Sequence, residues 1–212
     1  MKKIYGLIAG VFLMTGTQAQ TTIGIRGGVN LSTLVKNEKE SKASFKFGET
    51  AGIYATIKLV DKLFLQPELL YSSEGYKRTE TYNDDLTIIY RMRSSYLNLP
   101  VLAKYKLKNG VTFELGPQVS YLMGGHIKYT YNFNDENNIA VQESEKMKIK
   151  DDSTRSFEFA GVIGVGYELK GGYSFNARFT QGITNFVHYH DSNLNFKNQF
   201  FSFTVGIPIL KY

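Results

Sequence analysis

The chain has 212 residues, a formal charge of +6, no cysteine and no tryptophan, but 15 tyrosines, 15 phenylalanines and 20 glycines. This mild charge does not indicate a nucleic-acid partner, and the lack of cysteine excludes both a disulfide framework and acylation as a lipoprotein. Abundant Tyr, Phe and Gly favour β-strands, and the absence of a linker or compositional break after the N-terminus indicates one domain.

The N-terminus has the three parts of a secretory signal peptide. Two lysines precede an apolar run from Ile4 to Met14, and the small residues Thr17 and Ala19 stand at the cleavage positions. The run is shorter than the roughly 20 residues that span a bilayer as a helix. We therefore expect residues 1–19 to be a cleaved signal peptide and residues 20–212 to be the mature domain.

The mature chain contains segments in which apolar and polar residues alternate with the period of a β-strand. The eight segments are 23–30, 51–59, 63–72, 95–105, 111–121, 156–169, 173–180 and 201–209. In the fourth segment, for example, Leu97 and Leu99 alternate with Asn98 and Pro100. Such strands have one apolar and one polar face, and we assign the apolar rows to the outside.

The connections between these segments are of two kinds. Three are short turns, at 60–62, 108–110 and 170–172, and four are longer polar stretches, at about 32–48, 73–91, 124–154 and 186–198. Strict alternation of short and long connections is typical of outer-membrane barrels with periplasmic turns and external loops. The alternative, a periplasmic or secreted β-sandwich, does not normally sort its connections onto opposite ends.

The predicted fold class is therefore all-β, an eight-stranded antiparallel up-and-down transmembrane β-barrel with short periplasmic turns and longer extracellular loops. The even number of strands leaves both termini in the periplasm of a Gram-negative bacterium. All four prolines, Pro67, Pro100, Pro117 and Pro208, fall inside predicted strands. Because each removes a ladder donor in a sheet without free edges, we expect bulges at these sites and a break in the ladder at Pro100.

Several strands resemble those of the PorT-like outer-membrane β-barrel domain family. The resemblance is carried by Tyr96–Tyr105, which is similar to the family's fourth strand. It extends to its first, third, fifth and seventh strands, at 24–32, 65–71, 114–118 and 177–185. Asn98 departs from the pattern, because a glutamate is more usual there. The resemblance implies an eight-stranded barrel that tolerates these prolines. It implies a location in the outer membrane more than a biological role, although the family is named for a member associated with protein secretion.

The polar rows of the predicted strands contain four cations and four carboxylates. They are Arg26, Lys58, Lys104, Arg178, Glu68, Glu114, Glu158 and Glu168. An eight-stranded barrel is only just wide enough for side chains to fill its interior. We therefore interpret this set as an ionic network in a filled interior, in preference to a pore lining or a proton path. Arg26, Glu68 and Arg178 are expected at similar depth. The charges expected nearer the short turns are Lys58, Lys104, Glu114 and Glu168.

Other chemistry is only weakly indicated. His188, His190 and Asp191 form a cluster that could ligate a transition metal, although three polar residues in an exposed loop are more often solvated. No spacing of Ser, His and Asp selects a catalytic triad, and glycine runs without a following helix do not make a phosphate loop. We expect no enzyme activity, no cofactor and no resident metal.

The sequence predicts an integral outer-membrane protein with a structural or interaction role and a non-conducting interior. Its partners would be outer-membrane lipid and a protein bound through the extracellular loops or periplasmic turns. The charged third loop, 132–152, is expected to extend the two strands beside it as a protruding hairpin, whose surface is either solvated or partner-binding. The alternative function is an accessory component of a protein-secretion apparatus, followed by a small-solute channel or an enzyme with its site at the rim.

Overall fold

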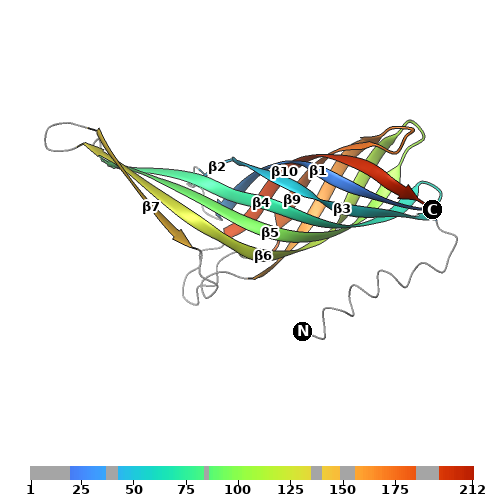
Figure 1. The fold of residues 1–212 in the computed structure, drawn as a ribbon, viewed down its shortest axis with the longest axis horizontal. Helices are drawn as coiled ribbons and strands as arrows, with labels where there is room; N and C mark the ends of the chain where they lie inside the picture. Colours follow the sequence, from blue (N-terminus) through green and yellow to red (C-terminus); the bar gives the residue numbers. More distant parts are fainter. Residues whose placement is uncertain (1–19, 37–42, 84–85, 135–139, 149–155, 185–195) are drawn as a thin grey trace.

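The computed structural model describes residues 20–36, 43–83, 86–134, 140–148, 156–184 and 196–212 (Figure 1). The described residues form only β-strands, turns and short connections, and no helix among them is long and apolar enough to cross a membrane. The strands are β1 (Thr21–Lys36), β2 (Ala43–Ser44), β3 (Lys46–Val60), β4 (Leu63–Asn83), β5 (Leu86–Lys106), β6 (Val111–Asn134), β7 (Ala140–Lys148), β8 (Phe157–Glu168), β9 (Ser174–Gly182) and β10 (Phe196–Lys211).

Within the described residues, eight of these strands close into a ring in the order β1-β3-β4-β5-β6-β8-β9-β10, and every neighbouring pair is antiparallel. The first and last strands form the closing seam, where the amides of Thr21 and Tyr212 each donate to the other residue's carbonyl at 3.2 and 2.9 Å. The predicted eight-stranded antiparallel barrel is confirmed.

The two faces of the ring have opposite polarity. Large apolar side chains point outward and stay exposed, as shown by Ile25 (44%), Ile163 (55%) and Phe203 (50%). The buried interior is mostly polar and includes Arg26, Asn30, Gln66, Glu68, Glu114, Gln118, Asn176 and Arg178. A soluble protein hides its apolar face, so this arrangement is that of a barrel whose outer surface contacts lipid.

The three predicted short turns lie together at one end of the ring. They join β3 to β4, β5 to β6 and β8 to β9. Their left-handed positions are taken by Lys62 (φ 67°), Gly110 (φ 92°) and Gly172 (φ 91°). The start of β1 and the end of β10 are paired at this same end, which puts both ends of the barrel domain on the side of the short turns.

At the opposite end, the described residues of two predicted loops are in fact strands. The stretches 73–91 and 124–154 are predicted to be loops because they are polar, but β4, β5 and β6 continue through the described part of them in cross-strand pairing, and β7 adds to β6. Polarity does not exclude a strand when both faces of the sheet meet water, and these segments keep many β-branched and aromatic residues. Figure 1 shows these strands projecting far beyond the ring, and the short β2 pairs with β4 at Lys77 and Arg78.

We call this region the protruding sheet; it comprises Gly75–Asn83, Leu86–Arg93, Gly125–Asn134 and β7. The expected protruding hairpin in the third predicted loop is confirmed for β6, which continues to Asn134 and pairs with β7. A bulge at Met123, opposite the Ser95–Tyr96 step, separates the ring part of β6 from its protruding part. The predicted first loop, 32–48, is also shorter than expected, because β1 runs to Lys36 and β3 starts at Lys46.

The expectation for the prolines is confirmed only in part. A register shift at Ile23–Gly24 lies opposite Pro208, as predicted. At Pro100 the ladder is interrupted, since the β4–β5 pairing stops at Pro67–Val101 and resumes at Leu70–Asn98 in the same register. Pro67, Pro100 and Pro117 thus have no bulge. Proline lacks a backbone N–H, so one hydrogen bond of the ladder is lost, but no extra residue has to be inserted into the strand.

Candidate functional site

The centre of the barrel holds a buried ionic cluster built around Arg178 on β9. Its two terminal nitrogens donate to the two oxygens of Glu68 on β4, both at 2.7 Å. Its Nε donates to Glu114 Oε2 on β6, also at 2.7 Å. One planar guanidinium therefore joins two carboxylates from different sides of the ring, in the fork geometry that suits arginine better than lysine.

A second arginine balances the charge of this cluster. Arg26 Nη1 on β1 lies 3.2 Å from Glu68 Oε1, and its guanidinium carbon sits 5.1 Å from the ring centre of Tyr54. The cluster thus contains two buried cations and two buried carboxylates. Neutral donors complete it, because Gln66 and Asn176 each donate to Glu114 Oε1 at 3.1 Å.

A separate ion-pair group lies nearer the short turns. Lys104 and Lys106 on β5 donate to different oxygens of Glu168 at the end of β8. Lys104 is buried, whereas Lys106 is partly exposed. This group places two cations and one carboxylate at the turn-side end of the interior.

Toward the protruding sheet, two buried carboxylates are held only by neutral groups among the described residues. Glu74 accepts hydrogen bonds from Ser72 at 2.6 Å and Asn98 at 3.1 Å. Glu158 accepts from Tyr96 at 2.6 Å and from Asn198 at 2.7 Å. An apolar cluster of Met92, Tyr96 and Leu122, with Tyr76 and Ile127 packed against it, lies next to this level.

The interior of the ring contains a small cavity. A cavity of about 20 Å³ lies between the central cluster and the Glu74 level, lined among others by Asn30, Asn98 and Gln118. A volume of this size holds about one water molecule. The interior is therefore a packed polar core, which is what an eight-stranded barrel can accommodate.

Sequence comparison identifies the family to which this barrel belongs. The profile of the family described as "Outer membrane protein beta-barrel domain" matches residues 18–188. The chain is a member of this family. Together with the apolar outer face of the ring, membership places the protein in the outer membrane, as predicted, where lipid surrounds the barrel. No curated protein matches the chain significantly.

Solved structures with a similar fold include several outer-membrane barrels of low sequence identity. Neisserial surface protein A is 11% identical, with 89% of this chain and 99% of that chain covered at a TM-score of 0.43. Ail, the attachment invasion locus protein of Yersinia pestis, is 11% identical, with coverage of 91% and 100% and a TM-score of 0.41. OprG from Pseudomonas aeruginosa is 13% identical, with coverage of 91% and 95% and a TM-score of 0.37.

The outer-membrane barrel brings together six of the eight predicted interior charges. Arg26, Glu68, Glu114 and Arg178 form the central cluster, and Lys104 pairs with Glu168. Glu114 was expected nearer the short turns. The other two predicted residues lie outside the ion pairs among the described residues. Lys58 is half-buried close to the β3–β4 turn, and Glu158 lies beside Tyr96, beyond the reach of the arginines.

Sequence reasoning missed several polar residues that complete these groups, namely Gln66, Glu74, Tyr96, Lys106, Asn176 and Asn198. Glu74 was missed because its segment was assigned to a loop. Gln66, Tyr96 and Asn176 do lie on predicted inward rows, so the alternation was the available signal, but nothing in one strand reveals the partner on another. The proposed metal ligands His188, His190 and Asp191 lie outside the described residues, and the described part of the chain contains no group of acidic, His or Cys residues able to hold a metal.

Proposed function

We propose that this outer-membrane barrel is a closed, non-conducting scaffold that carries the protruding sheet on the outer side of the membrane for interaction, with no catalytic step of its own. The observation that supports this function most directly is the packed ionic core. Arg178 spans the ring between Glu68 and Glu114, so a hydrated ion would have to break these hydrogen bonds to pass. Buried ion pairs resist such rupture, because an uncompensated charge is left behind.

Planar-bilayer recording tests the closed interior. The wild-type protein is expected to give no stepwise conductance, whereas the triple variant Glu68→Ala/Glu114→Ala/Arg178→Ala, which hollows the core, provides an open comparison. Both proteins are delivered to the bilayer from lipid vesicles. Their folded state in these vesicles is verified by the shift of their gel band on heating, that is, by heat-modifiable migration. Reproducible steps from the wild-type barrel would contradict the proposal.

A second candidate is an accessory role in protein secretion, supported by the segments that resemble the PorT-like family, above all Tyr96–Tyr105. Under this alternative, a secretion component would co-purify stoichiometrically from native membranes in mild detergent. Recovery of the barrel alone, under conditions that preserve other membrane complexes, would argue for the scaffold role.

A further inference from the structure

The protruding sheet carries a row of cations on the face that continues the outer surface of the barrel. Lys77 on β4 pairs with Arg91 on β5, and Arg91 pairs with Lys128 on β6. Directly paired residues of antiparallel strands put their side chains on the same face, with strands about 4.8 Å apart. The backbone register continues to Lys146 of β7. We call Lys77, Arg91 and Lys128 the basic row.

No acidic group compensates this row within the described part of the chain, where its three side chains have neither a hydrogen bond nor an ion pair. The next paired positions outward, Thr79 and Ile89, bring no carboxylate. Like charges directly opposite each other destabilise a sheet. The free chain therefore carries an unfavourable arrangement that a bound anion would relieve.

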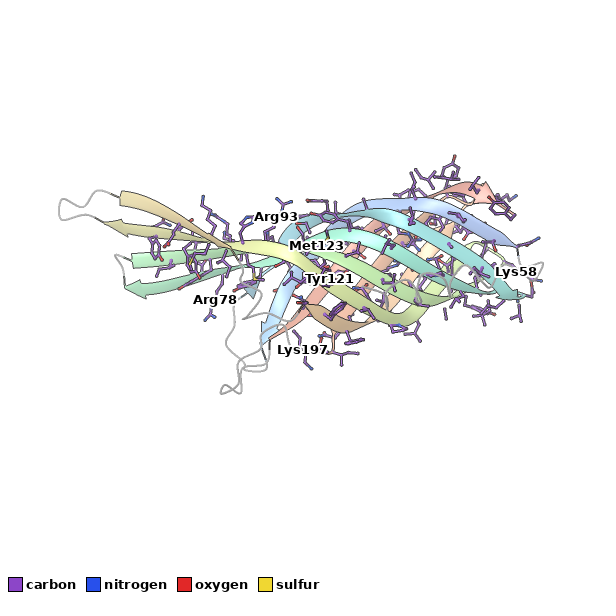
Figure 2. All side chains as sticks on the ribbon, turned by 60° about the horizontal axis from the view of Figure 1, so that its bottom comes forward. Lys58, Arg78, Arg93, Tyr121, Met123 and Lys197 are labelled. Atoms are coloured by element: carbon purple, nitrogen blue, oxygen red, sulfur yellow. The ribbon has the colours of Figure 1, made fainter. Side chains whose placement is uncertain are left out.

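A neighbouring cation on the same face of the sheet, Arg93, does have a counter-charge. Arg93 is one row nearer the ring; it is paired with the carboxylate of Glu49 and donates to Ser73 Oγ at 2.9 Å. Figure 2 shows Arg93 where the ring passes into the protruding sheet, with Met123 and Tyr121 following toward the ring. Arg93 thus already has its counter-charge, whereas the basic row beyond it does not.

The position of the row above the lipid-facing surface indicates the kind of anion. Tyr71, Leu97 and Tyr121 are exposed outward-facing residues of the apolar belt on the side of the protruding sheet. Arg91 is six residues beyond Leu97, about 20 Å along the strand and about 15 Å in height at the usual strand tilt. Long basic side chains can reach back toward the membrane surface. The row therefore overhangs the headgroup layer of the outer leaflet.

We propose that Lys77, Arg91 and Lys128 bind the phosphate groups of a phosphorylated glycolipid in the outer leaflet. Arginine offers a planar fork to phosphate oxygens, and the flanking lysines add point charges on either side. The site would hold the barrel in contact with one layer of lipid headgroups, in addition to the interaction role proposed above. Its failure would leave that role untouched, because the closed interior does not depend on it.

Binding of diphosphoryl lipid A to the purified full mature chain in detergent tests the proposal. The triple variant Lys77→Gln/Arg91→Gln/Lys128→Gln is compared with a matched variant, Lys62→Gln/Lys108→Gln/Lys170→Gln, which removes the same charge at the short turns. We expect wild type and matched variant to bind equally, and the basic-row variant to bind at least tenfold more weakly. Native mass spectrometry counts the retained lipid, and a titration gives the apparent Kd.

Four outcomes would contradict the proposed lipid site. Undiminished binding of lipid A by the basic-row variant would exclude the site. An equal loss of affinity in the matched variant would show that binding depends only on the net charge of the protein. Lipid A stripped of phosphate that binds as tightly would exclude phosphate recognition. Inorganic phosphate that competes at the same concentration would indicate a free anion instead of a lipid. If the triple variant lost its heat-modifiable band, the single variant Arg91→Gln would be measured in its place, with a several-fold loss expected.

Discussion

Arg178 is the residue on which the interior depends most. Its guanidinium is buried and forms three hydrogen bonds of 2.7 Å to two carboxylates that come from strands on other parts of the ring. Because these bonds connect β9 to β4 and β6, they cross-link strands that are not neighbours in the ring. The pairing satisfies Arg178 itself and also prevents Glu68 and Glu114 from being buried as unpaired charges.

Removal of this side chain is expected to be costly. Arg178→Ala should lower the free energy of unfolding by about 3 to 5 kcal/mol, because two buried carboxylates lose a shared cation. Lys58→Ala is the matched control, since Lys58 is a predicted interior cation without an ion pair among the described residues, and it should change stability by less than about 1 kcal/mol. Urea unfolding in detergent micelles, followed by circular dichroism, measures both. Equal effects of the two variants would contradict the central role of Arg178.

At this scale the sequence allowed part of the site to be predicted. The fixed spacing of side chains along a strand made it possible to count depth from each short turn, and this placed Arg26, Glu68 and Arg178 together. It did not place Glu114 with them, because the tilt and stagger of neighbouring strands shift residues counted to one depth onto different levels. Tyr96 and Glu158 meet across 62 positions of sequence, and only the register of the closed ring brings them together.

At the scale of strands, the closing seam between β1 and β10 depends on small residues. Gly28 of β1 lies so close to β10 that an added Cβ would be 2.0 Å from the carbonyl oxygen of Phe203. The contact is with backbone, so relief requires the two strands to separate. At the adjacent Gly27, which faces outward, the nearest atom to an added Cβ would be 3.8 Å away.

The neighbouring glycines offer a matched test of this seam. Gly28→Ala is expected to destabilise the barrel by about 1 to 3 kcal/mol through overpacking, whereas Gly27→Ala should leave stability nearly unchanged. The fraction of protein that keeps its heat-modifiable migration over a urea series measures the difference. If both variants unfolded at the same urea concentration as wild type, the close approach of β1 to β10 would not limit the substitution.

Strand existence was easier to predict from the sequence than strand length. All eight ring strands show alternation because one face contacts lipid and the other the polar core. Beyond the membrane this contrast disappears, so Lys77–Thr81 and Arg91 read as loop although they continue the ladder. The sequence between the paired residues Asn83 and Leu86 also lacks an Asn-Gly signal of the kind that marked the turn at Asn109–Gly110.

For the whole molecule, the orientation in the membrane follows from the two unlike ends. The ends of the barrel domain and the three short turns lie at one end, and the protruding sheet lies at the other (Figure 1). An outer-membrane barrel keeps its short turns in the periplasm. The protruding sheet, with the basic row on one face and the Tyr90–Tyr129 ring pair on the other, then faces the outside.

Cysteine labelling of intact cells tests this orientation without background, because the chain contains no cysteine. Thr79→Cys places a thiol at an exposed position of the protruding sheet, and Lys108→Cys places one at an exposed short turn. A maleimide attached to a polymer too large to cross the outer membrane should label the first variant in intact cells. It should label the second only after the membrane is permeabilised, while the wild-type chain stays unlabelled throughout. Labelling of Lys108→Cys but not Thr79→Cys in intact cells would reverse the orientation, and the basic row would then face the periplasm, away from the outer leaflet whose phosphates it is proposed to bind.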